Sequence, residues 1–184
     1  MSPIEELMNE HRAILSALDV IEAICRQIDE GKPCPADDVA RILEFLKTFA
    51  DRCHHAKEEN LLFPALEEAG VPKERGPIGV MLSEHALGRK YISLMSEALE
   101  GVRSHSVSAP GALASNARAY INLLRAHIMK ENEVLFPLAE RRLSAVVQEN
   151  LSSAFARYEE EEIGRSEHER FHSMLRELHD EYLA

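Results

Sequence analysis

Apolar residues recur at helical spacing along nearly the whole chain, and no segment has the strict alternation of a strand. The pattern predicts four long helices, over residues 3–30, 37–69, 77–100 and 112–142. Joined by short links, they predict an all-α fold, an up-down-up-down four-helix bundle. The first helix carries its apolar stripe on Ile4, Leu7, Met8, Ile14, Leu15, Leu18, Ile21, Cys25 and Ile28.

Further helical periods follow the bundle, over residues 144–163 and 166–182, with Ser144 as a cap of the first. They predict a C-terminal helical extension. We therefore divide the chain into a bundle, residues 1–142, and an extension, residues 143–184, packed on the same domain. The extension covers the bundle or forms a dimer contact. Asp37 or Asp38 is expected to cap the second helix.

Two prolines lie inside predicted helices, Pro64 in the second and Pro137 in the fourth. Proline lacks a backbone donor and clashes with the preceding turn. We expect a kink or a short break at each.

Polar residues interrupt the apolar stripes at corresponding places. His11 and His85 fall inside the stripes of the first and third helices. The inner face of the second helix reads Leu43, Leu46, Ala50, His54, Glu58 and Leu61, and that of the fourth reads Leu113, Tyr120, Leu124, His127, Glu131, Val134 and Leu138.

These polar residues form one pattern that occurs twice. Glu10-His11 is followed 43 residues later by His54, with Glu58 and Phe63-Pro64 behind it. Glu84-His85 is followed 42 residues later by His127, with Glu131 and Phe136-Pro137 behind it. Such a repeat predicts two halves that close around a shared metal centre.

The residue types fit two metal ions better than one. Residues four apart lie on one helix face, so each His-x-x-x-Glu pair presents an imidazole and a carboxylate together. Buried polar groups are costly unless partners satisfy them, and metal ions would do so. Each ion would receive two histidines and shared oxygens of Glu58 and Glu131, which leaves room for a bridging oxo or hydroxo group and an open position. Imidazole and carboxylate without thiolate suit iron or manganese and tolerate zinc.

Other interpretations stay open. A single inward histidine is usually a satisfied core residue, and a bundle without metal is one alternative. His55 and Glu59 form a second pair four residues apart, but aligning the two Leu-Phe-Pro ends matches them to Ile128 and Asn132. The alignment selects His54 and Glu58, with His55 and Glu59 as neighbours.

Composition and charge exclude several classes of function. Charged residues make up 29% and hydrophobic residues 45% of 184, as in an ordinary globular domain. The net charge of −11 argues against nucleic-acid partners. No apolar run approaches the roughly 20 residues of a membrane span, and the acidic N-terminus is unlike a signal peptide. Three scattered cysteines fit a reducing cytoplasm.

The motifs at His11, His54/Glu58, His85 and His127/Glu131, with both Leu-Phe-Pro tails, resemble the hemerythrin-like family, or HHE cation-binding domain. The resemblance implies a bundle with a non-haem diiron centre bridged by Glu58 and Glu131. By analogy, His11 and His54 would serve one iron, and His85 and His127 the other.

The chain departs from the oxygen-carrying members of that family. These have a further histidine on the third helix, where Met81 and Arg89 stand four residues either side of His85. The set of four histidines and two glutamates looks like the bacterial regulatory and iron-centre-repair members. We expect a protein that senses or reacts with O₂, peroxide or nitric oxide, in stress or iron homeostasis. The alternatives are a non-catalytic module for metal storage or signalling, with a homodimer or protein partner, and an O₂-binding protein. The sequence does not decide whether the chain is an enzyme.

Several other residues have a functional and a structural interpretation. Arg89 and Tyr120 either reach the centre or are a solvated and a core residue. Glu10 and Glu84 either bond a neighbouring helix or, as we expect, lie on a solvated face. Cys53 is expected to be a small buried hydrophobe rather than a redox sensor. His168, His172 and His179 either form a second metal site or, as we expect, lie on a packing helix.

Overall fold

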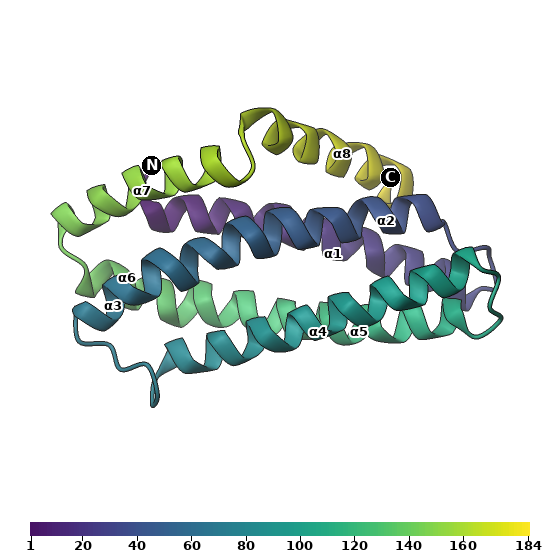
Figure 1. Ribbon diagram of the computed structural model, residues 1–184, viewed down its shortest axis with the longest axis horizontal. Helices are drawn as coiled ribbons and strands as arrows, with labels where there is room; N and C mark the ends of the chain where they lie inside the picture. Colours follow the sequence, from purple (N-terminus) through teal and green to yellow (C-terminus); the bar gives the residue numbers. More distant parts are fainter.

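The computed structural model describes all 184 residues and is all-α, as predicted. The chain forms four long helical rods and two further helices. Figure 1 shows the rods packed antiparallel, with the two further helices lying lengthwise along one side. The first rod is α1, Pro3–Asp29, and the third is α4, Pro77–Arg103. The bundle and its C-terminal extension are therefore confirmed. No helix combines the length and the apolar character required to cross a membrane.

The second and fourth rods each contain π-helical turns. The second consists of α2, Ala36–Phe45, the π-helical segments η1, Leu46–His55, and η2, Glu58–Leu62, and then α3, Phe63–Glu68. The fourth consists of α5, Ala109–Lys130, the π-helical segment η3, Glu131–Leu135, and α6, Phe136–Arg142. Thus η2 and η3 each begin at a predicted bridging glutamate.

The prolines follow these π-helical turns instead of breaking the rods. The N–H of Phe63 bonds the carbonyl of Glu58, and the N–H of Phe136 bonds that of Glu131, so each bond spans five residues. A kink or a short break is expected at each proline, and the structure shows no break: η2 continues directly into α3 at Phe63, and η3 into α6 at Phe136. The irregularity of the backbone is a π-helical turn just before each proline instead.

The wider turns also change which residues face inward. Val134 was predicted to be buried and is 56% exposed, while the next residue, Leu135, is fully buried. In the second rod, Leu62 is fully buried and Leu61 only partly so. A π turn holds one residue more than an α turn, so the buried position moves one residue along the chain.

Helix starts follow simple capping chemistry in two places. Ser2 accepts the N–H of Glu5 while the Glu5 carboxylate accepts the N–H of Ser2, which begins α1. Ser144 caps α7, Ala145–Glu162, as predicted. The cap predicted at Asp37 or Asp38 is wrong, because α2 begins at Ala36 and places both carboxylates in its first turn.

The extension lies over α1 and the second rod (Figure 1). Helix α7 packs on η1 and η2, and α8, Arg165–Leu183, packs on α1. The buried residues of α8 are Phe171, Met174, Leu175 and Leu178, and they belong to the larger apolar cluster of the protein. The predicted boundary at residue 143 lies between α6, which ends at Arg142, and α7, which begins at Ala145. The division of one domain into these two parts stays a prediction.

Two apolar clusters fill the bundle, and a polar layer lies between them. On α1, His11 stands between Leu7 of the smaller cluster and Ile14 of the larger one. His85 on α4 stands in the same way between Met81 and Ile92. The histidines of all four rods therefore meet at one level of the bundle.

Candidate metal centre

The structure brings together all six residues predicted as metal ligands. They are at most 1% exposed: His11, His54, Glu58, His85, His127 and Glu131. They form two clusters able to hold a metal ion, each with donor atoms within 4.8 Å of one another. One cluster contains His11 and His54, the other contains His85 and His127, and Glu58 and Glu131 belong to both. The pairing is the one expected by analogy.

Each carboxylate lies between two imidazoles. Nε2 of His11 and Nε2 of His127 are both 3.1 Å from oxygens of Glu131. Nε2 of His54 and Nε2 of His85 are 3.5 and 3.4 Å from oxygens of Glu58. Both carboxylates are therefore placed so that their two oxygens can serve different ions.

Several atoms at the heart of this layer are buried without a hydrogen bond. They are both carboxylate oxygens of Glu58 and of Glu131, and Nε2 of His11 and His54. A buried polar atom without a partner costs on the order of 1–3 kcal/mol, and more when it is charged. Six such atoms at one level, all of types that bind metal, fit a cation site well.

The opposite nitrogen of each imidazole is already engaged. Glu10 lies 2.7 Å from Nδ1 of His54, and Glu84 lies 2.9 Å from Nδ1 of His127. Each of these glutamates immediately precedes the first histidine of its own half. The expectation that Glu10 and Glu84 lie on a solvated face is therefore wrong, because their carboxylates turn inward to hold an imidazole.

The imidazoles of His11 and His85 are each held by a residue from the other half of the repeat. Asn132 lies 2.8 Å from Nδ1 of His11, and Glu59 lies 2.7 Å from Nδ1 of His85. Asn132 follows Glu131, and Glu59 follows Glu58, so each half holds the first histidine of the other. Fixing Nδ1 leaves Nε2 of each ring free to bind metal, which is the usual arrangement for metal-binding histidines.

Two lysines complete this repeated support and were missed from the sequence. Lys57 bonds Glu10, and Lys130 bonds Glu84. Lys57 is fully buried, pairs also with Glu6 and Glu159, and lies over the ring of Phe155. The signal was present in the sequence, because a lysine precedes the second glutamate in both copies of the pattern.

Burial and charge pull the pKa values of the site in opposite directions. Burial lowers the pKa of His85, but the carboxylates of Glu58 and Glu59 outweigh it and raise that pKa to about 9. Burial dominates at His54 and lowers its pKa to about 3. Burial would raise the pKa of Glu131, yet His127 and His11 hold it well below its usual value. The carboxylate of Glu131 is therefore stabilised by the positive charge of the imidazoles beside it.

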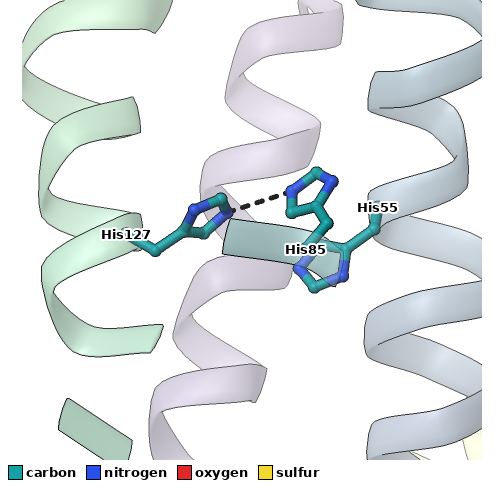
Figure 2. A group of neighbouring side chains, drawn as sticks. All are labelled: His55, His85 and His127. Atoms are coloured by element: carbon teal, nitrogen blue, oxygen red, sulfur yellow. Dashed lines mark hydrogen bonds between the residues drawn. The ribbon is translucent and has the colours of Figure 1, made fainter. Parts of the chain in front are cut away.

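His55 lies much nearer to the site than its alignment suggests. Its ring stacks on that of His85 with centroids 4.0 Å apart and meets the ring of His127 edge-on at 5.7 Å. Figure 2 shows the three rings together, with the close contact of 3.1 Å between Nε2 of His85 and Nε2 of His127. Nδ1 of His55 lies 3.3 Å from Asp51. Burial lowers the pKa of His55 well below its usual value, so this ring is neutral.

Arg89 reaches the centre through another side chain. Its guanidinium bonds Asp51 and Glu59, and Glu59 holds His85. Tyr120 is a core residue, 2% exposed, near His55. Cys53 is buried, and burial raises its pKa to about 12, so its thiol is unreactive. The expectation of a small buried hydrophobe holds for Cys53.

The histidines of the extension form no complete cluster. His168 and His172 have ring centroids 4.6 Å apart, and both pack against Phe49. His168 is 3.6 Å from Glu159, and His179 is exposed. They lie on a helix that packs on the bundle, as expected.

The model of one family, described as the hemerythrin HHE cation binding domain, matches residues 2–139. An uncharacterized protein of Mycobacterium tuberculosis is 27% identical over 162 residues, which are 88% of this chain and 63% of that protein. No solved structure matches.

Iron-sulfur cluster repair proteins are among the other relatives. An iron-sulfur cluster repair protein YtfE of Edwardsiella ictaluri is 30% identical over 132 residues, 70% of this chain and 59% of that protein. The YtfE protein of Yersinia pseudotuberculosis is 28% identical over 136 residues, 72% of this chain and 61% of that protein. The chain thus spans about three fifths of the length of these relatives.

Proposed function

Since the chain belongs to the hemerythrin HHE cation-binding domain family, we propose that it holds two non-haem iron ions and senses or reacts with O₂, peroxide or nitric oxide. His11 and His54 would bind one ion, His85 and His127 the other, and Glu58 and Glu131 would bind both. When bound, two redox-active ions would supply electrons to a small oxidant. The setting we propose is oxidative or nitrosative stress, or iron homeostasis, in the cytoplasm.

The observation that carries this proposal is the set of unpartnered atoms in the polar layer. Glu58 and Glu131 offer four buried oxygens without hydrogen bonds. Two imidazoles approach each carboxylate, one from either side. The donor set contains no thiolate, which suits iron or manganese. The similarity to YtfE proteins, which are iron-sulfur cluster repair proteins, supports the setting of stress and iron chemistry.

The side chains around the six residues would orient the imidazoles, exclude water and compensate charge at such a centre. The partners at Nδ1 keep each ring oriented and make it a better donor. Burial of the layer keeps bulk water away from the ions. Two carboxylates and four neutral imidazoles would leave two ferrous ions with a net charge of about +2, before any smaller ligand binds. The paired Lys57 and Lys130 prevent Glu10 and Glu84 from adding uncompensated negative charge.

Metal analysis tests the proposal directly. Protein purified from iron-replete cells should contain about two irons per chain, and the oxidised form should have the optical spectrum of a bridged diferric pair. The variants Glu58→Gln and Glu131→Gln should each lose most of the iron, because each replaces one oxygen of a carboxylate that would bind both ions and removes its charge. Glu133→Gln is the matched control, since Glu133 lies exposed on the same π turn as Glu131.

The results separate the proposal from its alternatives. Zinc alone, or unchanged iron content in both glutamine variants, would overturn it. Consumption of peroxide that is lost with the iron would make the protein an enzyme. Stable iron with no reaction toward O₂, peroxide or nitric oxide would favour the storage or signalling module instead.

A further inference from the structure

A cavity of about 280 Å³ opens beside one half of the site. It lies between η1 and α4, with Leu46 and Asp51 on one wall and Gly88 and Arg89 on the other. The buried ring of Tyr120, from α5, is part of its lining. The volume exceeds that of several water molecules, each of which takes about 30 Å³ in the liquid, so the cavity admits small molecules.

His55 separates this cavity from the half of the site formed by His85 and His127. It lines the cavity, and its ring stacks on His85 at 4.0 Å. The view in Figure 2 shows His55 lying against His85, with His127 across from it. One donor nitrogen of each of the three rings lies within 4.8 Å of the others. A molecule in the cavity is therefore one imidazole ring away from the proposed metal.

The half formed by His11 and His54 is approached differently. At the place that corresponds to His55 in the repeat stands Ile128, which is 3% exposed and belongs to the larger apolar cluster. A cavity of about 460 Å³ does lie on that side, but it ends at Glu10, whose carboxylate covers His54. The two halves thus differ in access although their donor sets are the same.

The residues that line the two cavities differ in charge, so the two cavities favour different ligands. The cavity beside Glu10 is lined by four glutamates and one arginine, so its net charge repels anions: Glu6, Glu10, Glu159, Glu160 and Arg165. The cavity beside His55 is lined by Lys47, Arg89 and Asp51, and Arg89 already pairs with Asp51 and with Glu59 behind it. Lys47 is therefore the unpaired cation of the lining. In a chain with a net charge of −11, this ammonium at the mouth of the cavity is suited to small anions.

We propose that the cavity between η1 and α4 binds small inorganic anions such as azide, nitrite or hydroperoxide and delivers them to the His85 and His127 half, with His55 as the side chain that moves aside. The inference rests on the proposed function, because the anion would end at the metal held there. It assigns the two metal positions different roles: one receives ligands and the other does not.

The access step is tested by narrowing the cavity in the iron-loaded protein. Ser93 lines the mouth and is exposed, so Ser93→Leu should fold normally. Association of azide, followed by its absorption change in stopped flow, should slow by about tenfold, within the range by which association rates vary among variants of one site. Ala156→Leu, which narrows the acidic cavity instead, should leave the rate unchanged.

The charge of the mouth is tested with Lys47→Glu. Azide association should fall by about fivefold at low ionic strength and approach the parent rate at high salt. Lys73→Glu, an exposed residue outside the cavity, changes the net charge equally and serves as control. Binding of nitric oxide, which is neutral, should not respond to Lys47→Glu but should slow in Ser93→Leu.

His55 itself is tested with His55→Ala. The variant should keep about two irons and its optical spectrum, while azide should associate faster because no ring has to move. Loss of one iron would make His55 a metal ligand and overturn its assignment as a gate. Equal azide rates in the parent and Ser93→Leu proteins, both with full iron, would overturn the cavity as the route and leave the diiron proposal standing. Absence of iron in the parent would overturn both.

Discussion

At the scale of single residues, the partners that hold Nδ1 of each imidazole should determine how tightly the site binds metal. Glu10 and Glu84 hold the second histidine of their own half, and Asn132 holds the first histidine of the other. A ring whose Nδ1 is already held loses less conformational freedom when its Nε2 binds a metal. These neighbours should therefore affect metal affinity although they do not touch the metal.

Replacing Glu84 by Gln tests this effect. The amide keeps the shape of the carboxylate but loses its charge, and it leaves Lys130 without its partner. We expect iron to bind about 10–100-fold more weakly, as is common when such a partner is lost. Competition with a chelator would measure the change, and Glu97→Gln, at an exposed position of the same helix, should behave as the parent. Equal affinities in the two variants would contradict the role of Glu84.

The protonation of His85 makes the stability of the metal-free protein depend on pH. Its pKa is raised to about 9 in the folded protein, against about 6.5 in an unfolded chain. Because the folded pKa is the higher one, the added stability is complete below about pH 6.5 and is lost as the pH rises through about 9. The pKa values of His11 and His127 are raised too, which adds in the same direction.

The metal-free protein should therefore have a lower Tm at pH 9 than at pH 6.5. The difference should reach several degrees, since about 1 kcal/mol changes the Tm of a chain of this size by about 2–4 °C. Calorimetry of the metal-free protein and of its His85→Gln variant measures it, and the variant should depend less on pH. A Tm that rises over this interval would show that the imidazoles do not carry the charge.

Single residues also show how far the sequence could lead. The repeat alone selected His54 and Glu58 over His55 and Glu59, and the structure gathers the selected pair with the other four residues. The sequence does not fix the direction of Glu10 and Glu84, because both adjoin an inward histidine and a small rotation of the helix decides whether such a glutamate faces water or a neighbouring helix. The repeat has no second histidine at the position of His55, so the alignment does not assign His55 to the site. Only the packing of η1 against α4 brings its ring onto His85.

At the scale of helices, the π-helical turns are what the sequence did not predict. Hydrophobic periodicity assumes 3.6 residues per turn, so it placed Leu61 and Val134 inward. The turns at Glu58 and Glu131 hold an extra residue, and Leu62 and Leu135 are buried instead. The prolines gave a signal of irregular backbone, but a proline by itself does not distinguish a break from a wide turn.

Helix α8 should be part of the cooperative structure rather than a loose tail. Leu178 is fully buried and belongs to the larger apolar cluster. Leu178→Ala should lower the free energy of unfolding by about 2–5 kcal/mol, while His179→Ala, at the next and exposed position, should change it little. Urea unfolding followed by circular dichroism would measure both. A separate early transition, or no effect of Leu178→Ala, would show that α8 unfolds on its own.

At the scale of the whole molecule, the fold class followed from the sequence because every long segment has a helical period and the links are short. The candidate site followed because its residues recur in the same order in both halves. The position of the extension did not follow, since its apolar residues fit either the bundle or a second chain. The cavity between η1 and α4 did not follow either, because it depends on how two rods lie side by side.

The supports that cross between halves make the molecule equivalent to a dimer within one chain. Glu59 serves His85 and Asn132 serves His11, as in a face-to-face contact of two identical subunits, where each gives what it receives. These exchanged contacts relate the two halves of the chain as a twofold axis relates two subunits. A true homodimer would have to carry every substitution twice. Within one chain the two halves can differ at one place, and His55 opposite Ile128 is such a place. The two proposed metal positions can therefore differ in access.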